Sequence, residues 1–212
     1  MSDLAAPPAL EFTILGAEPI EHAASPGVRF HLLAGEPEGR EVYAVALSTQ
    51  IHIDPARRTY DDEARERLVE LFGPRERWGA TTHSFQWARI DTLVPSFSGS
   101  TPFTIEVPCT YDLEVASAKY FDGLQDGDVP LSFHFNGTVL YCGADDRLQV
   151  VLVPWSNTSR WSMPVDVWRR TIAAHYPGGG WIRLQHETLE ALSQRKAERG
   201  LHSFDDTVRE LL

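Results

Sequence analysis

The feature that most constrains the fold is a strict alternation of apolar and polar residues over positions 103–115. A period of two places the two sets of side chains on opposite faces of an extended strand. The polar set includes Pro108, which cannot donate a ladder hydrogen bond and marks an edge or an interruption. The segment therefore predicts a long antiparallel strand with one buried and one solvated face. The apolar members are Phe103, Ile105, Val107, Cys109, Tyr111, Leu113 and Val115.

Other segments show the same two-residue period. In residues 41–53 the large apolar side chains fall on odd positions, and in residues 84–94 the phase changes near Ala88. Such a change of phase predicts a β-bulge. The loop at 35–39 contains glycine and proline, so it predicts a hairpin that pairs the strands before and after it. Further strands are expected at 10–15, 28–34, 129–141 and 148–153.

Helical periodicity occurs once inside the strand-rich part and again near the C-terminus. Residues 61–72 begin with an aspartate pair suited to an N-cap and are followed by Gly-Pro, which ends a helix. From Ser162 onward the pattern is helical, with a first helix opened by proline and a second at about 186–199. A short third helix is expected to start at Ser203.

The order of strands first and helices last is typical of an α+β fold rather than of βαβ units. We expect a mostly β protein, either one antiparallel sheet covered by helices or a two-layer β-sandwich, followed by C-terminal helices. A chain of 212 residues fits a single domain. The predicted organisation is a disordered leader at 1–9 and one domain at 10–212, with a β-rich part at 10–155 and a helical part at 162–212.

Charge and cysteine content argue against several classes of function. The chain has 19 Lys and Arg against 30 Asp and Glu, a formal net charge of -11, so its field repels nucleic acid. No segment reaches the roughly 18 apolar residues of a membrane span, and the N-terminus lacks the regions of a signal peptide. We therefore expect a cytoplasmic protein with a buried, reduced thiol at Cys109. A disulfide between Cys109 and Cys142 stays open as an alternative.

The usual catalytic and metal-binding motifs are missing from the sequence, which contains no G-x-S-x-G, H-E-x-x-H, P-loop or dinucleotide fingerprint. The glycines at 178–180 follow a predicted helix instead of leading into one, which favours a helix end over a phosphate site. His52 and Asp54 lie near the end of a strand, with His52 on its solvated face, and we interpret it as a solvated histidine. No catalytic residue, metal ligand or cofactor is assigned.

Four of the six tryptophans lie within residues 155–181. Trp168 falls on the apolar stripe of a predicted helix and is expected in the core. The others have two interpretations. They fasten the helices to the sheet, since tryptophan is highly buried on average, or they anchor a partner protein together with nearby arginines. The candidate partner-binding residues are Trp155, Arg160, Trp161, Trp181 and Arg183.

Several short segments resemble an uncharacterised bacterial family encoded near the genes of uptake nickel–iron hydrogenases. They are Cys109–Val115 with Lys119-Tyr120, Gly127–Leu131, Phe135–Val139, Val153–Trp155, His175–Pro177 and Gly180–Leu184. The resemblance covers nearly the whole chain from Leu10 and brings no assigned catalytic residues. It implies an accessory role in maturation, assembly or handling of the hydrogenase. The order of strands and proline-initiated helices is also similar to that of the export chaperone SecB, which implies a holding function.

Two main classes of function remain, beside a third possibility, a metal-delivery protein, which predicts bound nickel or iron. The first is a non-catalytic accessory, assembly or chaperone-like protein that binds another protein, with a hydrogenase subunit or maturation factor as the partner that the resemblance implies. The alternative is a small soluble hydrolase or transferase with a dispersed site. A deep polar pocket with convergent acids and histidines would favour the enzyme. An exposed apolar groove near Trp155, Trp161 and Trp181 would favour the binding protein. The sequence leaves the oligomeric state open.

Overall fold

The computed structural model describes residues 7–110, 112, 115–143, 147–178 and 182–212. The chain divides into two compact units, Met1–Gly179 and Gly180–Leu212. The first contains strands β1 to β9 and helices α1 to α5, and the second contains α6 (His186–Arg199) and α7 (Phe204–Arg209). No helix in the described ranges is both long enough and apolar enough to span a membrane.

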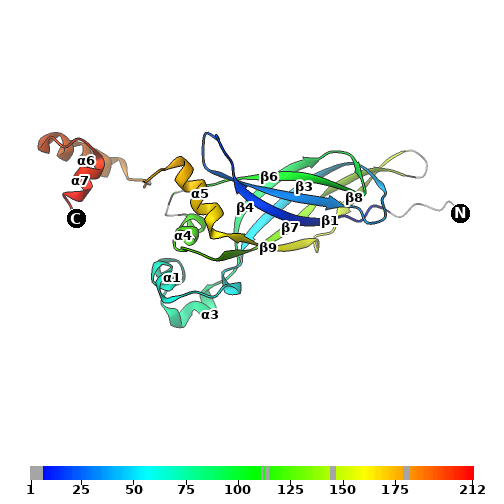
Figure 1. Cartoon of the computed structure of the whole chain (residues 1–212), viewed down its shortest axis with the longest axis horizontal. Helices are drawn as coiled ribbons and strands as arrows, with labels where there is room; N and C mark the ends of the chain where they lie inside the picture. Colours follow the sequence, from blue (N-terminus) through cyan, green and yellow to red (C-terminus); the bar gives the residue numbers. More distant parts are fainter. Residues whose placement is uncertain (1–6, 111, 113–114, 144–146, 179–181) are drawn as a thin grey trace. The chain divides into compact units, whose positions relative to one another are not determined.

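The first unit is built on two antiparallel sheets (Figure 1). The smaller sheet has the order β1-β2-β6, with β1 at Glu11–Pro19, β2 at Gly27–Gly35 and β6 at Ser100–Pro108. The larger sheet has the order β4-β3-β7-β8, while β5 pairs with β3 and β9 pairs with β7. Its strands are β3 (Glu41–Ile53), β4 (Phe85–Val94), β5 (Phe97–Ser98), β7 (Asp128–Cys142), β8 (Leu148–Val153) and β9 (Thr158–Pro164).

Aromatic side chains join the inner faces of the two sheets. Phe12 of β1 stacks on Phe135 of β7 with ring centroids 4.5 Å apart. Phe30 of β2 meets Phe133 of β7 edge-on at 5.3 Å, and all four rings are buried. The fold is therefore α+β and mostly β. Of the two predicted architectures, the protein adopts the two-layer β-sandwich.

The predicted hairpin between β2 and β3 is wrong. β2 pairs with β1 and β6, whereas β3 pairs with β4, β5 and β7, so the loop between them crosses from one sheet to the other. Within the loop the buried carboxylate of Glu36 accepts the backbone N–H of Arg40 at 2.7 Å and its guanidinium at 3.2 Å. Alternation in each strand predicts a buried face, but it does not say which sheet the strand joins.

Strand β9 (Thr158–Pro164) occupies a segment where we predicted no strand and expected a helical pattern from Ser162 onward. It pairs antiparallel with the first half of β7, from Asp128↔Pro164 to His134↔Thr158. Helix α5 (Val165–His175) consequently begins after Pro164 rather than at Ser162. The strand was missed because three of its first five residues are Thr or Ser, which weakens the apolar period.

Other local predictions are confirmed. Ile51 pairs with Ala88 and His52 with Gln86, so the bulge predicted near Ala88 leaves Trp87 as the extra residue. The predicted helix at 61–72 forms α1 (Asp62–Arg67) and α2 (Val69–Phe72), and the side chain of Asp61 accepts the N–H of Ala64 as an N-cap. In the second unit α6 covers 186–199 as predicted, and Ser203 caps α7.

The long alternating segment forms β6 only as far as Pro108, where the predicted interruption lies. Residues 111, 113 and 114 lie outside the described residues. Cys109 and Cys142 are both free cysteines, and Cys109 is buried. Burial raises the pKa of the Cys109 thiol to about 12, so it stays protonated, as a structural core cysteine does.

Helices close one end of the sandwich (Figure 1). Helix α4 (Ala116–Asp122) lies against α5, where Phe121 stacks on Trp168 with ring centroids 4.5 Å apart. Trp168 is buried, as predicted for the helix stripe. Helix α5 also packs on β1 and β2. The unit is completed by α3 (Trp78–Thr81) and by two short 3-10 helices, Pro55–Arg57 and Arg75–Arg77.

The close approach of β3 and β7 gives a first prediction. Gly137 has φ 157°, and a Cβ added to it would overlap the carbonyl oxygen of Ala46 and lie 3.0 Å from the Cα of Leu47. Gly137→Ala should therefore lower the free energy of unfolding by about 1–3 kcal/mol, measured by urea denaturation. Gly16→Ala is the matched control, because a Cβ there meets nothing within 4 Å. Equal unfolding midpoints for the two variants would contradict this strand packing.

Candidate functional site

The larger sheet turns one face toward the smaller sheet and the other face away from it. Residues on neighbouring strands are held in register, so that Leu93, Ala46, Thr138 and Leu152 form one row across four strands. We call this second face the outer face. It consists of alternate residues of β3 (46–52), β4 (89–93), β7 (132–140), β8 (148–152) and β9 (158–160).

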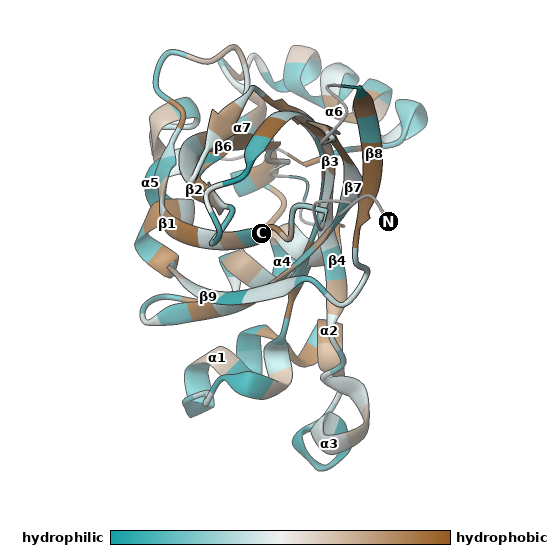
Figure 2. Cartoon of the chain, turned by 90° about the vertical axis from the view of Figure 1, so that its right-hand side faces the viewer, coloured by the Kyte–Doolittle hydropathy of each residue, from teal (hydrophilic) through white to brown (hydrophobic). Residues whose placement is uncertain are grey.

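One half of the outer face is apolar. Leu93 and Leu152 are each 70% exposed, Val150 is 61% exposed and Leu148 is 55% exposed, so nothing in the described part of the first unit covers them. Figure 2 shows most of β8 in the colour of hydrophobic residues. A depression of about 380 Å³ between β3 and β4 adjoins Leu93 and Ala46. We call Leu93, Leu148, Val150 and Leu152 the apolar patch.

The other half of the outer face is polar. The rings of His52 and His134 lie 4.9 Å apart, on neighbouring strands. The hydroxyl of Ser132 donates to Asp54, and Arg57 lies 3.8 Å from the same carboxylate. We call His52, Asp54, Ser132 and His134 the polar cluster. It combines the residue types of acid–base catalysis with a serine. Which group accepts the proton of the serine therefore decides what chemistry the cluster supports.

The contacts of the polar cluster do not activate a nucleophile. In nucleophilic catalysis an imidazole accepts the serine proton and a carboxylate orients the imidazole. A serine hydroxyl has one proton, and here the hydroxyl of Ser132 donates it directly to Asp54. Within the described ranges, no three His, Cys, Asp or Glu side chains come together in a group suited to a metal ion.

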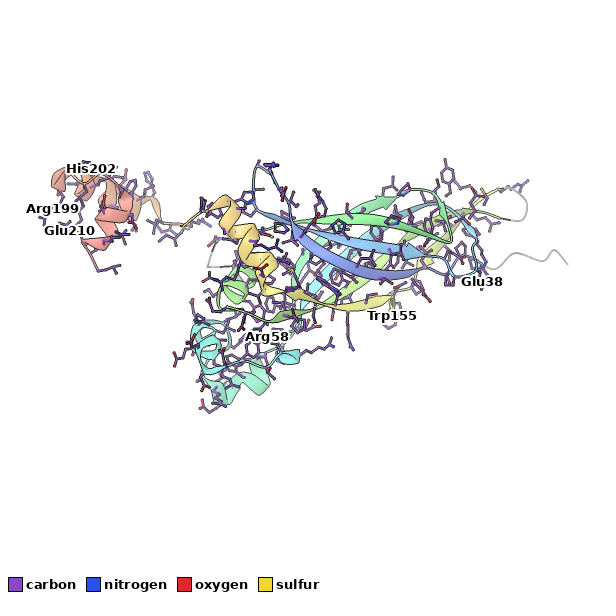
Figure 3. All side chains as sticks on the ribbon, in the orientation of Figure 1. Glu38, Arg58, Trp155, Arg199, His202 and Glu210 are labelled. Atoms are coloured by element: carbon purple, nitrogen blue, oxygen red, sulfur yellow. The ribbon has the colours of Figure 1, made fainter. Side chains whose placement is uncertain are left out.

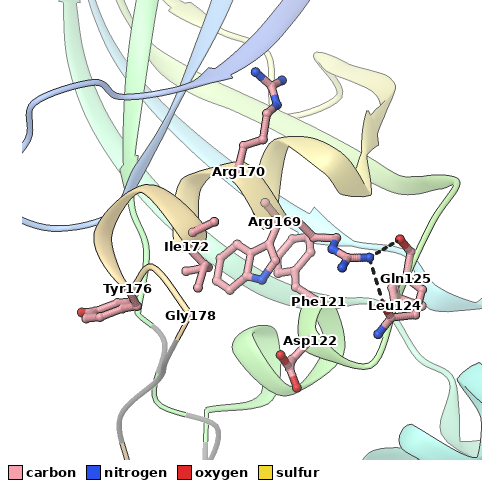
Figure 4. A pocket seen from close by; sticks show the side chains of 11 residues that line it. Phe121, Asp122, Leu124, Gln125, Arg169, Arg170, Ile172, Tyr176 and Gly178 are labelled. Carbon is pink, nitrogen blue, oxygen red and sulfur yellow. Dashed lines mark hydrogen bonds between the residues drawn. The ribbon is translucent and has the colours of Figure 1, made fainter.

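A second hollow lies in the first unit between α4 and α5 (Figure 4). It has a volume of about 430 Å³ and a floor that includes the buried rings of Phe121 and Trp168. At its rim Arg169 donates to the backbone oxygen of Gln125 at 2.8 Å and to its side-chain oxygen at 2.9 Å. Nη1 of Arg169 is therefore already bound to a glutamine, and because glutamine is neutral these contacts do not neutralise the charge of the guanidinium.

The five predicted partner-binding residues lie in different environments. Trp155 follows β8 directly and is 88% exposed (Figure 3). Arg160 lies on the outer face and is exposed, whereas Trp161 points to the core and meets Phe30 edge-on at 6.1 Å. Arg183 is exposed in the second unit, and Trp181 lies outside the described residues. The structure thus brings Trp155 and Arg160 to the larger sheet and uses Trp161 in packing.

The apolar patch was not predicted from the sequence. The segment Leu-Gln-Val-Val-Leu-Val at 148–153 has almost no polar residue, and such a run is typical of a strand buried on both faces. The sequence did contain one sign of the patch. Residues 148–153 carry no charge, whereas strands at the edge of a sheet are usually protected by charged residues. That signal has meaning only once the sheet order is known.

Burial of the imidazole lowers the pKa of His52, the neighbouring His134 lowers it further, and Asp54 opposes both effects. His52 should therefore titrate below 6.5 when its ring protons are followed by NMR. His134→Gln removes the neighbouring imidazole and should shift the pKa of His52 upward. A pKa at or above 6.5 in the unsubstituted protein, or no upward shift in the variant, would contradict the ring contact.

Comparisons with known proteins show the family but no activity. No curated protein matches. Among solved structures the chain is similar to a β-glucosidase from Kluyveromyces marxianus, with 6% identity, a TM-score of 0.27, and coverage of 74% of this chain and 15% of that one. It is also similar to β-glucosidase 3B from Thermotoga neapolitana, with 10% identity, a TM-score of 0.27, and coverage of 73% and 17%.

These two likenesses span less than one fifth of the enzymes' length, and at such TM-scores they carry no argument about function. A family model matches almost the whole chain. The expected membership of an uncharacterised family is confirmed by this match, and the link to hydrogenases stays a prediction. Residues 7–212 match the model of a family of unknown function, DUF6084, and the chain belongs to that family.

Proposed function

We propose that this protein is a non-catalytic accessory or assembly factor that binds another protein through the outer face of its larger sheet. The observation that supports the proposal is the apolar patch, whose four side chains are all exposed on the apolar half of that face. Exposed apolar patches with a polar rim are characteristic of interaction sites. Covering such a patch yields about 25 cal/mol per Å² of apolar surface removed from water.

The form of the surface supports binding over catalysis. Small-molecule sites are concave and enclose most of their ligand, whereas the apolar patch and the polar cluster lie on one sheet face. Arg160 lies on that face and the exposed Trp155 lies between β8 and β9, and both residue types are common anchors of protein interfaces. The partner is therefore expected to lie across the strands of the larger sheet.

We propose a hydrogenase subunit or a hydrogenase maturation factor as the partner, and the cytoplasm as the setting. The family resemblance of the sequence supports the partner class. The two free cysteines suit a reducing compartment, where thiols are kept unpaired. A chaperone-like role in holding the partner before assembly is consistent with a surface that offers apolar contacts.

A capture experiment tests the proposal. The tagged full chain is expressed in its own host, and proteins that elute with it are identified by mass spectrometry. The protein should recover a specific partner, and the double variant Val150→Thr/Leu152→Thr should lose it, because both substitutions remove apolar contact area while keeping residues that favour strands. Both positions are exposed, so the unfolding free energy should stay within about 0.5 kcal/mol.

The matched control is Leu15→Thr, which changes an exposed leucine of similar exposure on the smaller sheet. This control should keep the partner. Recovery of no specific protein by the unsubstituted chain would refute the proposed function. Equal recovery by the double variant would show that the outer face is not the binding surface.

A further inference from the structure

The sheets of the first unit end in strands that are guarded in different ways. Strands at the edge of a sheet present unpaired backbone N–H and C=O groups, and natural proteins protect them with charges, prolines or covering segments. β4 carries Arg89 and Asp91, and β6 carries Pro102, Glu106 and Pro108. Each of these edges therefore has at least two features that oppose pairing with another chain.

The edges of β1 and β9 protect each other. The side chain of Asn157 donates to the backbone oxygen of Leu10 at 2.7 Å, and the hydroxyl of Ser159 donates to the backbone oxygen of Phe12. These contacts satisfy edge carbonyls of β1 with side chains at the start of β9. β1 also contains a bulge between Ile14 and Gly16, which disturbs the flat geometry that an added strand needs.

β8 is the exception. It ends the order of the larger sheet, and within the described residues it pairs with β7 alone, from Gly137↔Val153 to Cys142↔Leu148. Its six residues, Leu-Gln-Val-Val-Leu-Val, contain no charge, no proline and no glycine. Three of the six are valines, which are common in strands, and the register with β7 has no shift. The strand is thus a regular and unguarded edge.

Apolar side chains follow the free edge of β8 at regular intervals. Leu148, Val150 and Leu152 are exposed on the outer face at every second residue. A strand added beside β8 would lie at about 4.8 Å and would place its own alternate side chains next to this row. Backbone hydrogen bonds then provide affinity, and the row of apolar side chains selects the sequence.

The charge of the chain limits what occupies the edge. Two copies of a chain with a formal charge of -11 repel each other, which disfavours pairing of β8 with itself. A basic segment is attracted by the same field, and a neutral segment is not repelled by it. An added strand must also be free to extend, which is a property of a chain segment that has not yet folded or assembled.

We infer that β8 binds an extended segment of the partner protein by strand addition, and that this segment is apolar at alternate positions and neutral or basic overall. The inference rests on the proposed function and deepens it by naming the mode of binding and the chemistry of the partner segment. Strand addition at β8 is distinct from packing on the outer face, because it uses the free backbone groups of one strand and not the breadth of the sheet.

Hydrogen exchange of the full chain tests strand addition directly. The probe is a synthetic peptide in which valine and lysine alternate, and its control is a peptide of the same composition with the alternation broken. The alternating peptide should slow the exchange of backbone amides in Leu148–Val153 and leave those of β4 unchanged. Binding of both peptides to the same extent, no binding of either, or binding without protection of β8 would overturn the inference.

Two variants distinguish binding at the edge of β8 from binding on the outer face. Val150→Lys places a guarding charge on β8 and should weaken peptide binding by about tenfold or more. Leu93→Lys is the matched control, since it changes a similarly exposed member of the apolar patch on β4, which lies three strand spacings from β8, about 14 Å. It should bind the alternating peptide within about twofold of the unsubstituted chain. If Val150→Lys fails to fold, Val150→Thr replaces it and should weaken binding in the same direction.

The outcomes also distinguish this inference from the proposed function. In the capture experiment, retention of the partner by Val150→Lys together with its loss by Leu93→Lys would support binding on the outer face and refute strand addition. Loss by Val150→Lys alone supports strand addition. A dimer of the unsubstituted chain in sedimentation that disappears in Val150→Lys would show that a second copy occupies the edge, and would overturn the choice of occupant.

Discussion

The packing of aromatic rings between the two sheets is the interaction on which the rest of the structure depends. Phe12 and Phe30 from the smaller sheet meet Phe135 and Phe133 of β7, which is one of the two inner strands of the larger sheet. Because these rings occupy one face of β7, the residues between them must point the other way. The polar side chains of that strand, Ser132 and His134 among them, are brought to the outer face by this constraint and not by a separate functional design.

The same constraint explains why β8 is exposed. β7 is long enough to pair with β9 along its first half and with β8 along its second half. The smaller sheet reaches β9 through β1, as the contacts from Asn157 and Ser159 show. Within the described residues nothing comparable reaches β8, so an apolar strand with a regular register is left at an open edge. Exposed apolar strands favour association, and this is why we propose that a partner binds at this edge.

Much of the local structure could be predicted from the sequence, because turn residues and side-chain periods act over a few residues. The N-cap at Asp61, the bulge beside Ala88 and the helix at 186–199 are of this kind. Sheet membership could not be predicted, since β2 and β3 have the same period whether they form a hairpin or a crossover. The candidate site was missed for the same reason. Only the sheet order distinguishes Leu152 on an exposed edge from a leucine buried between strands.

The central claim is that the partner contacts β8 and the outer face. Site-specific photocrosslinking tests it most directly, with a photoreactive residue placed at Leu152 in one protein and at Leu15 in another, since both leucines are exposed but lie on different sheets. The account predicts a crosslinked partner protein from position 152 and none from position 15. A crosslink from position 15 with none from position 152 would contradict it.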